Sequence, residues 1–324
     1  MSTPMHNAGL HEHTFHATSV FNPQSPQAEE IAKLFYIDLA IAFAILLIVT
    51  ILVVIAIFRF RQRPGQVEPV QDPGNPKLET LWTVVPSVVV VVLLVLTART
   101  MHLVNPPVGN RTPNVIVTAH QWWWAYHYPQ SGVIAANELH LSAGTNWLLG
   151  IESADVIHDF WVPDLGAKMD AIPGHPNYLW ITPHATGVYL GTCAEYCGAE
   201  HALMGIRVVV QSPEDFVRWE QEQLRVPAAP TGAEAELGAR LFAEKTCASC
   251  HLIAGTSATG HVGPDLTHLA DRDTLGAGVL ANNVTNLTQW ILHPQALKPG
   301  CHMPALRLQA AEARALAVYL GGLR

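Results

Sequence analysis

The distribution of apolar residues divides the chain into three parts, and the first part contains two long apolar runs. Leu39–Phe58 spans 20 residues and Leu81–Ala98 spans 18, and neither contains a charged residue. A hydrocarbon core about 30 Å thick is crossed by about 20 apolar residues of helix. Neither run has the polar stripe of a helix that packs on a soluble core. We therefore predict a transmembrane hairpin within residues 1–105, with spans at about 35–58 and 81–100.

After the hairpin the pattern becomes first strand-like and then helical. Five short runs separated by Pro, Gly and Asn predict a β-sandwich or barrel within 106–222. These runs are Val115–Ala119, Trp147–Ile151, Tyr178–Thr182, Val188–Gly191 and Ile206–Gln211. A Pro-, Ala- and Gly-rich linker is predicted at 223–232, followed by a small helical domain at 233–324. The helices predicted in that domain are Ala233–Glu244, Asn286–His293 and Ala310–Leu320.

Basic residues in the connector between the two spans set the predicted orientation. They are Arg59, Arg61, Arg63 and Lys77. Short loops rich in Lys and Arg stay in the cytoplasm, so both termini and everything after about residue 105 are predicted to be extracytoplasmic. Segment 1–33 lacks the basic start and early apolar run of a secretory signal, so we expect the first span to act as the insertion signal.

Composition and charge change this picture only slightly. Of the 324 residues, 49% are hydrophobic and 14% charged, and the net charge is −8. Residues 106–232 contain five Lys and Arg against twelve Asp and Glu, a net charge of −7. This charge is either a solvated face or a patch that attracts a basic partner, and we expect no nucleic-acid partner. Four histidines are expected to lie in a solvated tail rather than to bind a metal: His6, His11, His13 and His16.

The helical domain opens with a haem-attachment pattern. Cys247 and Cys250 are two of the five cysteines, and His251 follows directly in CASCH. CxxCH is typical of covalent c-type haem, with the histidine as an axial iron ligand. A redox dithiol or half of a zinc site also uses CxxC, but neither requires the adjacent histidine, and no second CxxC completes a zinc site.

The second axial ligand is predicted in KPGCHMP (298–304). Met303 is the main candidate, with His302 as a neighbouring rival and simple packing as the alternative. Methionine opposite histidine raises the haem potential and suits electron transfer. The pattern from CASCH through GPDL (263–266) to KPGCHMP resembles a class I cytochrome c. This resemblance implies that Pro264 accepts a hydrogen bond from the proximal histidine and that Met303 is the axial ligand. Cys301 remains as an unpaired, small side chain.

A second cluster of sulfur and imidazole ligands lies in the β-rich part. Its motif is Cys193-x3-Cys197-x3-His201-x2-Met204. Thiolate and thioether favour copper, and one cysteine with His and Met would suggest a mononuclear site. Two cysteines allow both sulfurs to bridge two copper ions, with His158 as the second imidazole. A disulfide between the cysteines is the alternative for an extracytoplasmic loop.

Residues from about 30 to 222 resemble subunit II of the haem–copper cytochrome c oxidases. The matching motifs are LETLWTVVP (78–86), HQWWWAYHYP (120–129), VIHDFWVPDLGAKMDAIPG (156–174) and CAEYCGAEHALM (193–204). The fused haem domain makes the chain similar to caa(3)-type oxidases. The implied fold is a multidomain membrane protein with a two-helix transmembrane hairpin, a cupredoxin-like β-barrel and an all-α cytochrome c domain.

The resemblance also implies roles for single residues. In the dinuclear copper centre CuA, Cys193 and Cys197 bridge the coppers, His158 and His201 are terminal ligands, and Met204 and the Glu195 carbonyl are weaker ligands. The carboxylate of Glu195 is expected to reach a Mg or Mn ion shared with subunit I. Glu79 matches the mouth of a proton pathway, although a carboxylate at a membrane boundary can also simply snorkel. Trp122 matches an electron-entry residue, while Trp123 and Trp124 are expected to pack or anchor.

The predicted function is that of an electron-entry subunit. Electrons pass from a donor through haem c to CuA and on to subunit I, where oxygen is reduced to water with proton translocation. No catalytic residue is expected in this chain. Subunits I and III, a cytochrome c or another periplasmic donor, and the bilayer of a bacterial inner membrane are the expected partners. The alternative is the electron-entry subunit of a CuA-containing nitric-oxide reductase. A free electron carrier or copper-delivery protein would not need the Glu79 motif or the Lys168 and Asp170 motif.

Overall fold

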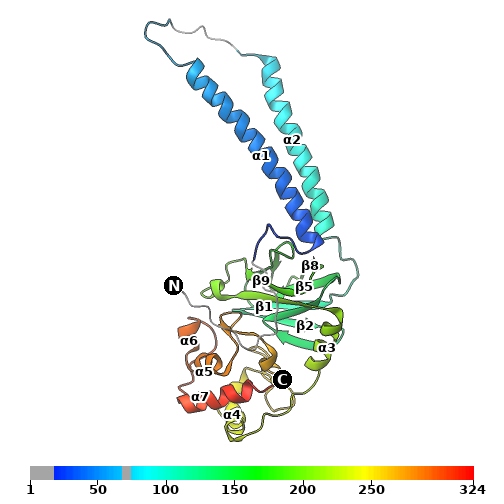
Figure 1. Cartoon of the computed structure of the whole chain (residues 1–324), viewed down its shortest axis with the longest axis vertical. Coiled ribbons are helices and arrows are strands. Elements are labelled where there is room, and N and C mark those ends of the chain that lie inside the picture. Colours follow the sequence, from blue (N-terminus) through cyan, green and yellow to red (C-terminus); the bar gives the residue numbers. More distant parts are fainter. Residues whose placement is uncertain (1–17, 68–73) are drawn as a thin grey trace. The chain divides into compact units, whose positions relative to one another are not determined.

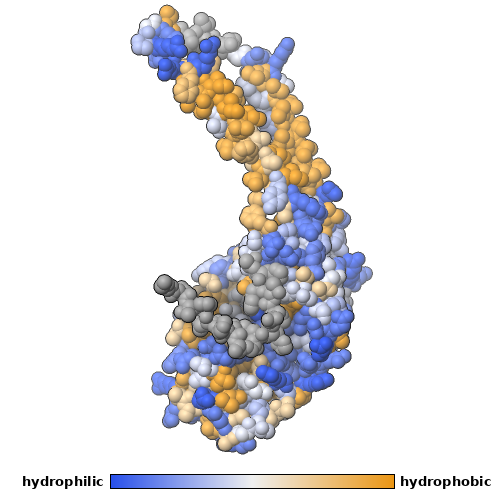
Figure 2. All heavy atoms as spheres, viewed as in Figure 1, coloured by the Kyte–Doolittle hydropathy of each residue, from blue (hydrophilic) through white to orange (hydrophobic). Residues whose placement is uncertain are grey.

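Two long helices make up most of the N-terminal part. The computed structural model describes residues 18–67 and 74–324 (Figure 1), so the four N-terminal histidines lie outside the described residues. Helix α1 is Pro26–Arg59 and helix α2 is Pro76–Val104. Asn75 caps α2 by accepting hydrogen bonds from the backbone N–H groups of Lys77 and Leu78. Both helices extend beyond the predicted spans. Figure 2 shows hydrophobic residues along most of the length of both helices on the face in view. They are long and apolar enough to cross a membrane.

Two five-stranded sheets follow the helices. The first has the order β3-β2-β1-β5-β8 and the second β4-β10-β9-β6-β7. In chain order the strands are β1 (Val115–His120), β2 (Trp123–Tyr128), β3 (Val133–Ala136), β4 (Glu138–Ser142), β5 (Trp147–Ser153), β6 (His158–Trp161), β7 (Met169–Ala171), β8 (Asn177–Ile181), β9 (Gly187–Cys193) and β10 (Gly205–Gln211). Pairs β1–β5 and β4–β10 are parallel, and the other pairs are antiparallel. The inward-facing residues of both sheets share one core, which includes Trp124, Phe160 and Tyr189.

The remaining elements are helices and 3-10 turns, together with one short β-hairpin. They are α3 (Pro213–Gln223), α4 (Ala233–Glu244), α5 (Val284–Leu292), α6 (Pro294–Leu297) and α7 (Ala310–Leu320), with 3-10 turns η1 (His201–Leu203), η2 (Cys247–Ser249) and η3 (Leu269–Asp271) and a hairpin of β11 (Thr274–Leu275) and β12 (Leu280–Ala281). Helix α3 packs on the sheets through Phe216 and Trp219. Helices α4 and α7 cross closely because position 238 is glycine, where a Cβ would lie 2.1 Å from the Ala315 carbonyl oxygen.

The sheets and the C-terminal helices belong to one compact unit, Val108–Arg324, which also includes the described residues up to Ala28. Residues 29–107 form a separate unit. We call residues 108–223 the copper domain and residues 233–324 the haem domain. Each has its own buried core.

Candidate metal centre and haem pocket

The predicted copper ligands meet at one end of the copper domain. Four of them lie on the loop between β9 and β10, and this loop is closed by a hydrogen bond from the Cys193 N–H to the Met204 carbonyl at 3.0 Å. His158 is the first residue of β6, which pairs with β9. Strand pairing therefore brings His158 beside a loop that is 35 residues away in the sequence.

Short distances join the ligand atoms of this cluster. The two cysteine sulfurs are 3.8 Å apart, too far for a disulfide bond of about 2.0 Å. Sγ of Cys193 lies 3.9 Å from His158 Nδ1 and 3.2 Å from the Glu195 carbonyl oxygen. Sγ of Cys197 lies 3.6 Å from His201 Nδ1 and 3.9 Å from Met204 Sδ. Among the described residues, His158, Cys193 and Cys197 form a group whose ligand atoms lie within 4.8 Å of one another. This soft, buried donor set fits copper.

Burial and hydrogen bonds prepare these ligands for a metal. His158 is 0% exposed and both cysteines are 2% exposed. A hydrogen bond from the Cys197 thiol lowers the pKa of Cys193, and a hydrogen bond with His158 lowers it further. Burial lowers the pKa of His158, but its contacts with Cys193 and Asp155 outweigh this effect and raise it overall. Asp155 Oδ1 lies 2.8 Å from His158 Nε2, so the other ring nitrogen, Nδ1, faces the sulfur.

Trp122 lies directly against the copper loop. Its Nε1–H donates to the Cys197 carbonyl at 3.1 Å, and the Gln121 side-chain amide donates to the same oxygen at 2.7 Å. Gly198 adopts a φ of +117°, and a Cβ there would lie 3.0 Å from the Trp122 ring. Glycine is therefore required at this close approach. Gln121, Asp155 and Gly198 act on the ligands through hydrogen bonds and close packing, and no sequence pattern predicted them.

The two carboxylates with predicted roles, Glu195 and Glu79, are more exposed than the copper ligands. The side chain of Glu195 is exposed, on the same loop as the two cysteines. Glu79 lies in the first turn of α2, within the separate helical unit. Lys168 Nζ is 3.8 Å from the buried carboxylate of Asp159, the residue that follows His158. The structure thus brings together the copper ligands, which all lie in the unit that contains the two sheets.

The CASCH segment forms one wall of a cavity that is lined mainly by the haem domain and also by Trp122 and Trp123 of the copper domain. His251 Nδ1 lies 2.8 Å from the Pro264 carbonyl oxygen, which can only accept, so Nδ1 carries the proton and Nε2 remains available. Burial lowers the pKa of His251 and favours the neutral imidazole. Position 263 is glycine, where a Cβ would lie 2.5 Å from the His251 ring. These contacts fix the ring as an iron ligand requires.

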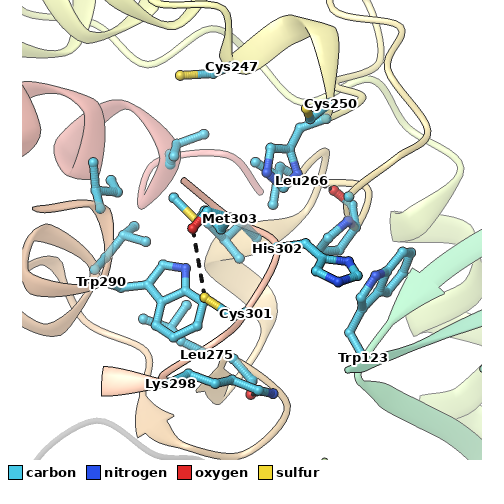
Figure 3. Close-up of a pocket in the computed structure, with 18 of the residues that line it drawn as sticks. Trp123, Cys247, Cys250, Leu266, Leu275, Trp290, Lys298, Cys301, His302 and Met303 are labelled. Carbon is cyan, nitrogen blue, oxygen red and sulfur yellow. Dashed lines mark hydrogen bonds between the residues drawn. The ribbon is translucent and has the colours of Figure 1, made fainter. Parts of the chain in front are cut away.

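The cavity itself has a volume of about 230 Å³. Figure 3 shows Cys247 and Cys250 on one side of it and His302 and Met303 on the loop opposite. Met303 is half-buried and packs against the haem-domain core, whereas His302 is exposed and its ring lies 5.1 Å from that of Trp122. The side chain of Gln295, which sequence reasoning missed, donates to the carbonyls of Cys301 and Met303 and so holds this loop. Apolar walls with two thiols, an imidazole and a thioether fit a covalent haem.

Comparisons with known proteins place each part of the chain in a known family. The family model described as "Cytochrome C oxidase subunit II, transmembrane domain" matches residues 15–98, the corresponding periplasmic domain matches residues 130–212, and "Cytochrome c" matches residues 235–324. Cytochrome c oxidase subunit 2 of Alkalihalophilus pseudofirmus is 33% identical over 313 residues, covering 94% of this chain and 91% of that protein. The chain belongs to the cytochrome c oxidase subunit 2 family.

Other members of the cytochrome c oxidase subunit 2 family cover less of the chain. The Bacillus subtilis protein is 32% identical over 289 residues, covering 83% of this chain and 81% of that protein. The crystal structure of the periplasmic domain of subunit II of cytochrome oxidase (CoxB) of Bradyrhizobium japonicum is 30% identical, with a TM-score of 0.35, covering 36% of this chain and 96% of that chain.

Membership in the cytochrome c oxidase subunit 2 family confirms the predicted resemblance and fold class. The chain has a two-helix membrane part, a cupredoxin-like copper domain and a helical cytochrome c domain. A subunit 2 with these domains is a membrane subunit of an oxidoreductase complex, and the domains imply copper and haem c as cofactors. The family also implies partnership with subunit I of a haem–copper oxidase.

Proposed function

We propose that this chain is the electron-entry subunit of a terminal oxidase, in which electrons pass from a donor through covalent haem c to a dinuclear CuA centre. From there they pass to subunit I, where oxygen is reduced to water with proton translocation. One observation carries the proposal: two cysteines, two histidines and a methionine, all buried except the half-buried His201, form a cluster in the same compact unit as a CxxCH haem pocket. When bound, the coppers and the haem iron supply reversible one-electron oxidation and reduction.

The copper domain would hold two coppers with residues that its fold already brings together. Cys193 and Cys197 are proposed as bridging ligands, and His158 and His201 as terminal ligands. Met204 and the Glu195 carbonyl would complete the set as weaker ligands. The burial of His158, Cys193, Cys197 and Met204 excludes water from their side of the cluster. Asp155 keeps Nδ1 of His158 directed at the cluster. Trp122 is proposed as the electron-entry residue because its indole donates to the carbonyl of a bridging cysteine.

The haem domain would attach haem through thioether bonds to Cys247 and Cys250. His251 and Met303 are the proposed axial ligands. The Pro264 carbonyl accepts a hydrogen bond from the Nδ1–H group of His251, so Nε2 would be the nitrogen that binds the iron. An axial methionine suits electron transfer rather than oxygen binding.

The remaining roles concern the complex and the membrane. The exposed Glu195 carboxylate is proposed to reach a Mg or Mn ion shared with subunit I. Glu79 is proposed to lie at the mouth of a proton pathway on the cytoplasmic side, and slower proton uptake from that side in Glu79→Ala would test this. Both redox domains are proposed to face the periplasm of a bacterial inner membrane, with subunit III as a further partner and a cytochrome c or another periplasmic carrier as the donor.

Metal and haem analysis of the detergent-solubilised oxidase tests the proposed function. We expect two coppers and one covalent haem in this chain, because the cluster has two cysteine sulfurs to bridge a pair and one CxxCH motif is present. Covalent haem per chain and the copper-to-oxidase ratio after subtraction of the copper held by subunit I, with near-infrared and paramagnetic spectra, provide the measurement. One copper per chain, or no covalent haem, would contradict the proposal.

Asp155→Ala should weaken copper binding without removing a ligand. Asp155 orients His158 from outside the cluster, and loss of such a partner typically costs about 10–100-fold in metal affinity. Competition with a copper chelator measures the affinity. Glu214→Gln is the matched control because it removes one exposed carboxylate from the same domain, on α3. Equal copper affinity in Asp155→Ala and Glu214→Gln would exclude the proposed role of Asp155.

A further inference from the structure

Lys298 is the one lysine among the described residues whose side chain is buried. It follows α6 and is 2% exposed. Its ammonium group donates three hydrogen bonds, to the carbonyl oxygens of Trp122 at 2.8 Å, Leu203 at 2.7 Å and Gly276 at 2.9 Å. An ammonium has three donors, so all of them are used. Burying a lysine is costly, so a side chain satisfied in this way places strong constraints on its surroundings.

The three acceptors come from both domains. Gly276 lies in the turn between β11 and β12 of the haem domain, whereas Trp122 and Leu203 belong to the copper domain. Leu203 immediately precedes the proposed copper ligand Met204, and Trp122 contacts the Cys197 carbonyl. Lys298 itself begins the loop that carries His302 and Met303 (Figure 3). One side chain therefore joins the haem-ligand loop, the copper loop and the proposed electron-entry residue.

Further polar contacts join the copper domain and the haem domain. Arg207 of β10 pairs with Asp273 at 2.5 Å, and Glu138 of β4 accepts hydrogen bonds from the N–H groups of Asp273 and Thr274, both at 3.0 Å. The Gly205 N–H donates to the Ala277 carbonyl at 3.1 Å. Buried charged and polar pairs of this kind fix one register between two surfaces.

The linker between the two domains would not by itself fix their relative orientation. Nine residues separate the end of α3 from the start of α4. A flexible linker of that length has a root-mean-square span of about 17 Å. It raises the local concentration of the haem domain but leaves its orientation free. Electron transfer slows steeply as two redox centres move apart, so orientation requires specific contacts.

Building on the proposed function, we propose that Lys298 is a positioning residue that holds the haem domain in one orientation on the copper domain, with the haem-ligand loop beside Trp122. The 5.1 Å separation between the His302 and Trp122 rings is the contact that this orientation creates. Burial lowers the pKa of Lys298 to about 8, and the neighbouring Glu200 of the copper loop, itself buried, partly opposes this effect.

Lys298→Met tests the proposal because methionine keeps an unbranched side chain but removes all three donors. In the complete oxidase, we expect faster hydrogen exchange at the amides that donate between the domains, those of Gly205, Asp273 and Thr274. Amides within β1 and α7 should keep their protection, because each domain retains its own core. This measurement does not depend on turnover.

The second readout is the rate of electron transfer from haem to CuA after flash reduction. We expect a decrease of about tenfold or more, since only the docked fraction of molecules transfers electrons. The potentials of both centres should stay unchanged. Arg314→Met is the matched control, because it removes an exposed cation of the haem domain that pairs with Glu234 in the same domain. It should leave both readouts at wild-type values.

Unchanged exchange or an unchanged transfer rate in Lys298→Met would overturn the proposal. If that variant does not accumulate, Asp273→Asn tests the same docking from its other edge, and it should change both readouts in the same direction. Wild-type exchange and transfer in Asp273→Asn would then count against the fixed docking. Failure of the proposed function is distinguishable, because it would appear as missing copper or haem in the wild-type chain.

Discussion

Replacing Cys197 with serine is expected to abolish the near-infrared absorption and the mixed-valence paramagnetic signal of a two-copper centre, while the haem c spectrum stays intact. The sulfur of Cys197 lies within 3.9 Å of Cys193, His201 and Met204, so it is the shared point of the cluster. A serine hydroxyl is a harder donor and does not ionise at neutral pH, so it cannot replace a bridging thiolate. Optical and paramagnetic spectra of the purified oxidase provide the measurement.

Cys301→Ser is the matched control for this variant. Among the described cysteines, Cys301 belongs to neither the copper cluster nor the CASCH motif, so its replacement should preserve both sets of signals. A surviving two-copper signal in Cys197→Ser would exclude the proposed bridging role. Loss of the haem spectrum in the same variant would indicate that the two sites do not fold independently.

Elements with strong periodicity could be predicted from the sequence. The five predicted strands correspond to β1, β5, β8, β9 and β10, and the predicted helices of the haem domain correspond to α4, α5 and α7. Strand β2 was not predicted because its sequence WWAYHY has no polar and apolar alternation. Strands β6 and β7 have only four and three residues, too few to show a period. Strand β6 pairs with β9 and strand β7 pairs with β6. The pairing of β6 with β9 is a long-range effect that local patterns cannot reveal.

The site residues also divide into those that a local sequence motif predicts and those that only the folded chain brings to the site. The cysteines, His201 and Met204 share a short motif with characteristic spacing, so a local pattern predicted their grouping. His158 required a contact across 35 residues, which resemblance supplied and strand pairing explains. Asp155, Gln121 and Lys298 left no signal because each acts through one or more hydrogen bonds in the folded chain. A charged residue in sequence is usually exposed, and nothing local distinguishes the buried Lys298 from the exposed Lys33.

Replacing Met303 with alanine should leave the haem covalently attached but lower its reduction potential. Cys247, Cys250 and His251 remain in that variant, so attachment and the proximal ligand are retained. A thioether opposite histidine stabilises the reduced iron, and its loss should lower the potential by an amount on the order of 0.1 V, within the range of about 0.8 V that axial ligands span. Potentiometric titration of the haem absorbance in the full chain measures the change.

His302→Ala is the comparison that assigns the ligand. His302 and Met303 are adjacent on the same loop, but only Met303 packs against the haem-domain core, whereas His302 faces Trp122. The His302 variant should therefore keep the haem potential of the wild type, and its effect should fall on the rate of transfer between the domains. If the potential changes in His302→Ala and stays constant in Met303→Ala, the axial ligand is His302. The ring packed against Trp122 would then have to turn into the cavity on haem binding, which would break the contact that Lys298 is proposed to maintain.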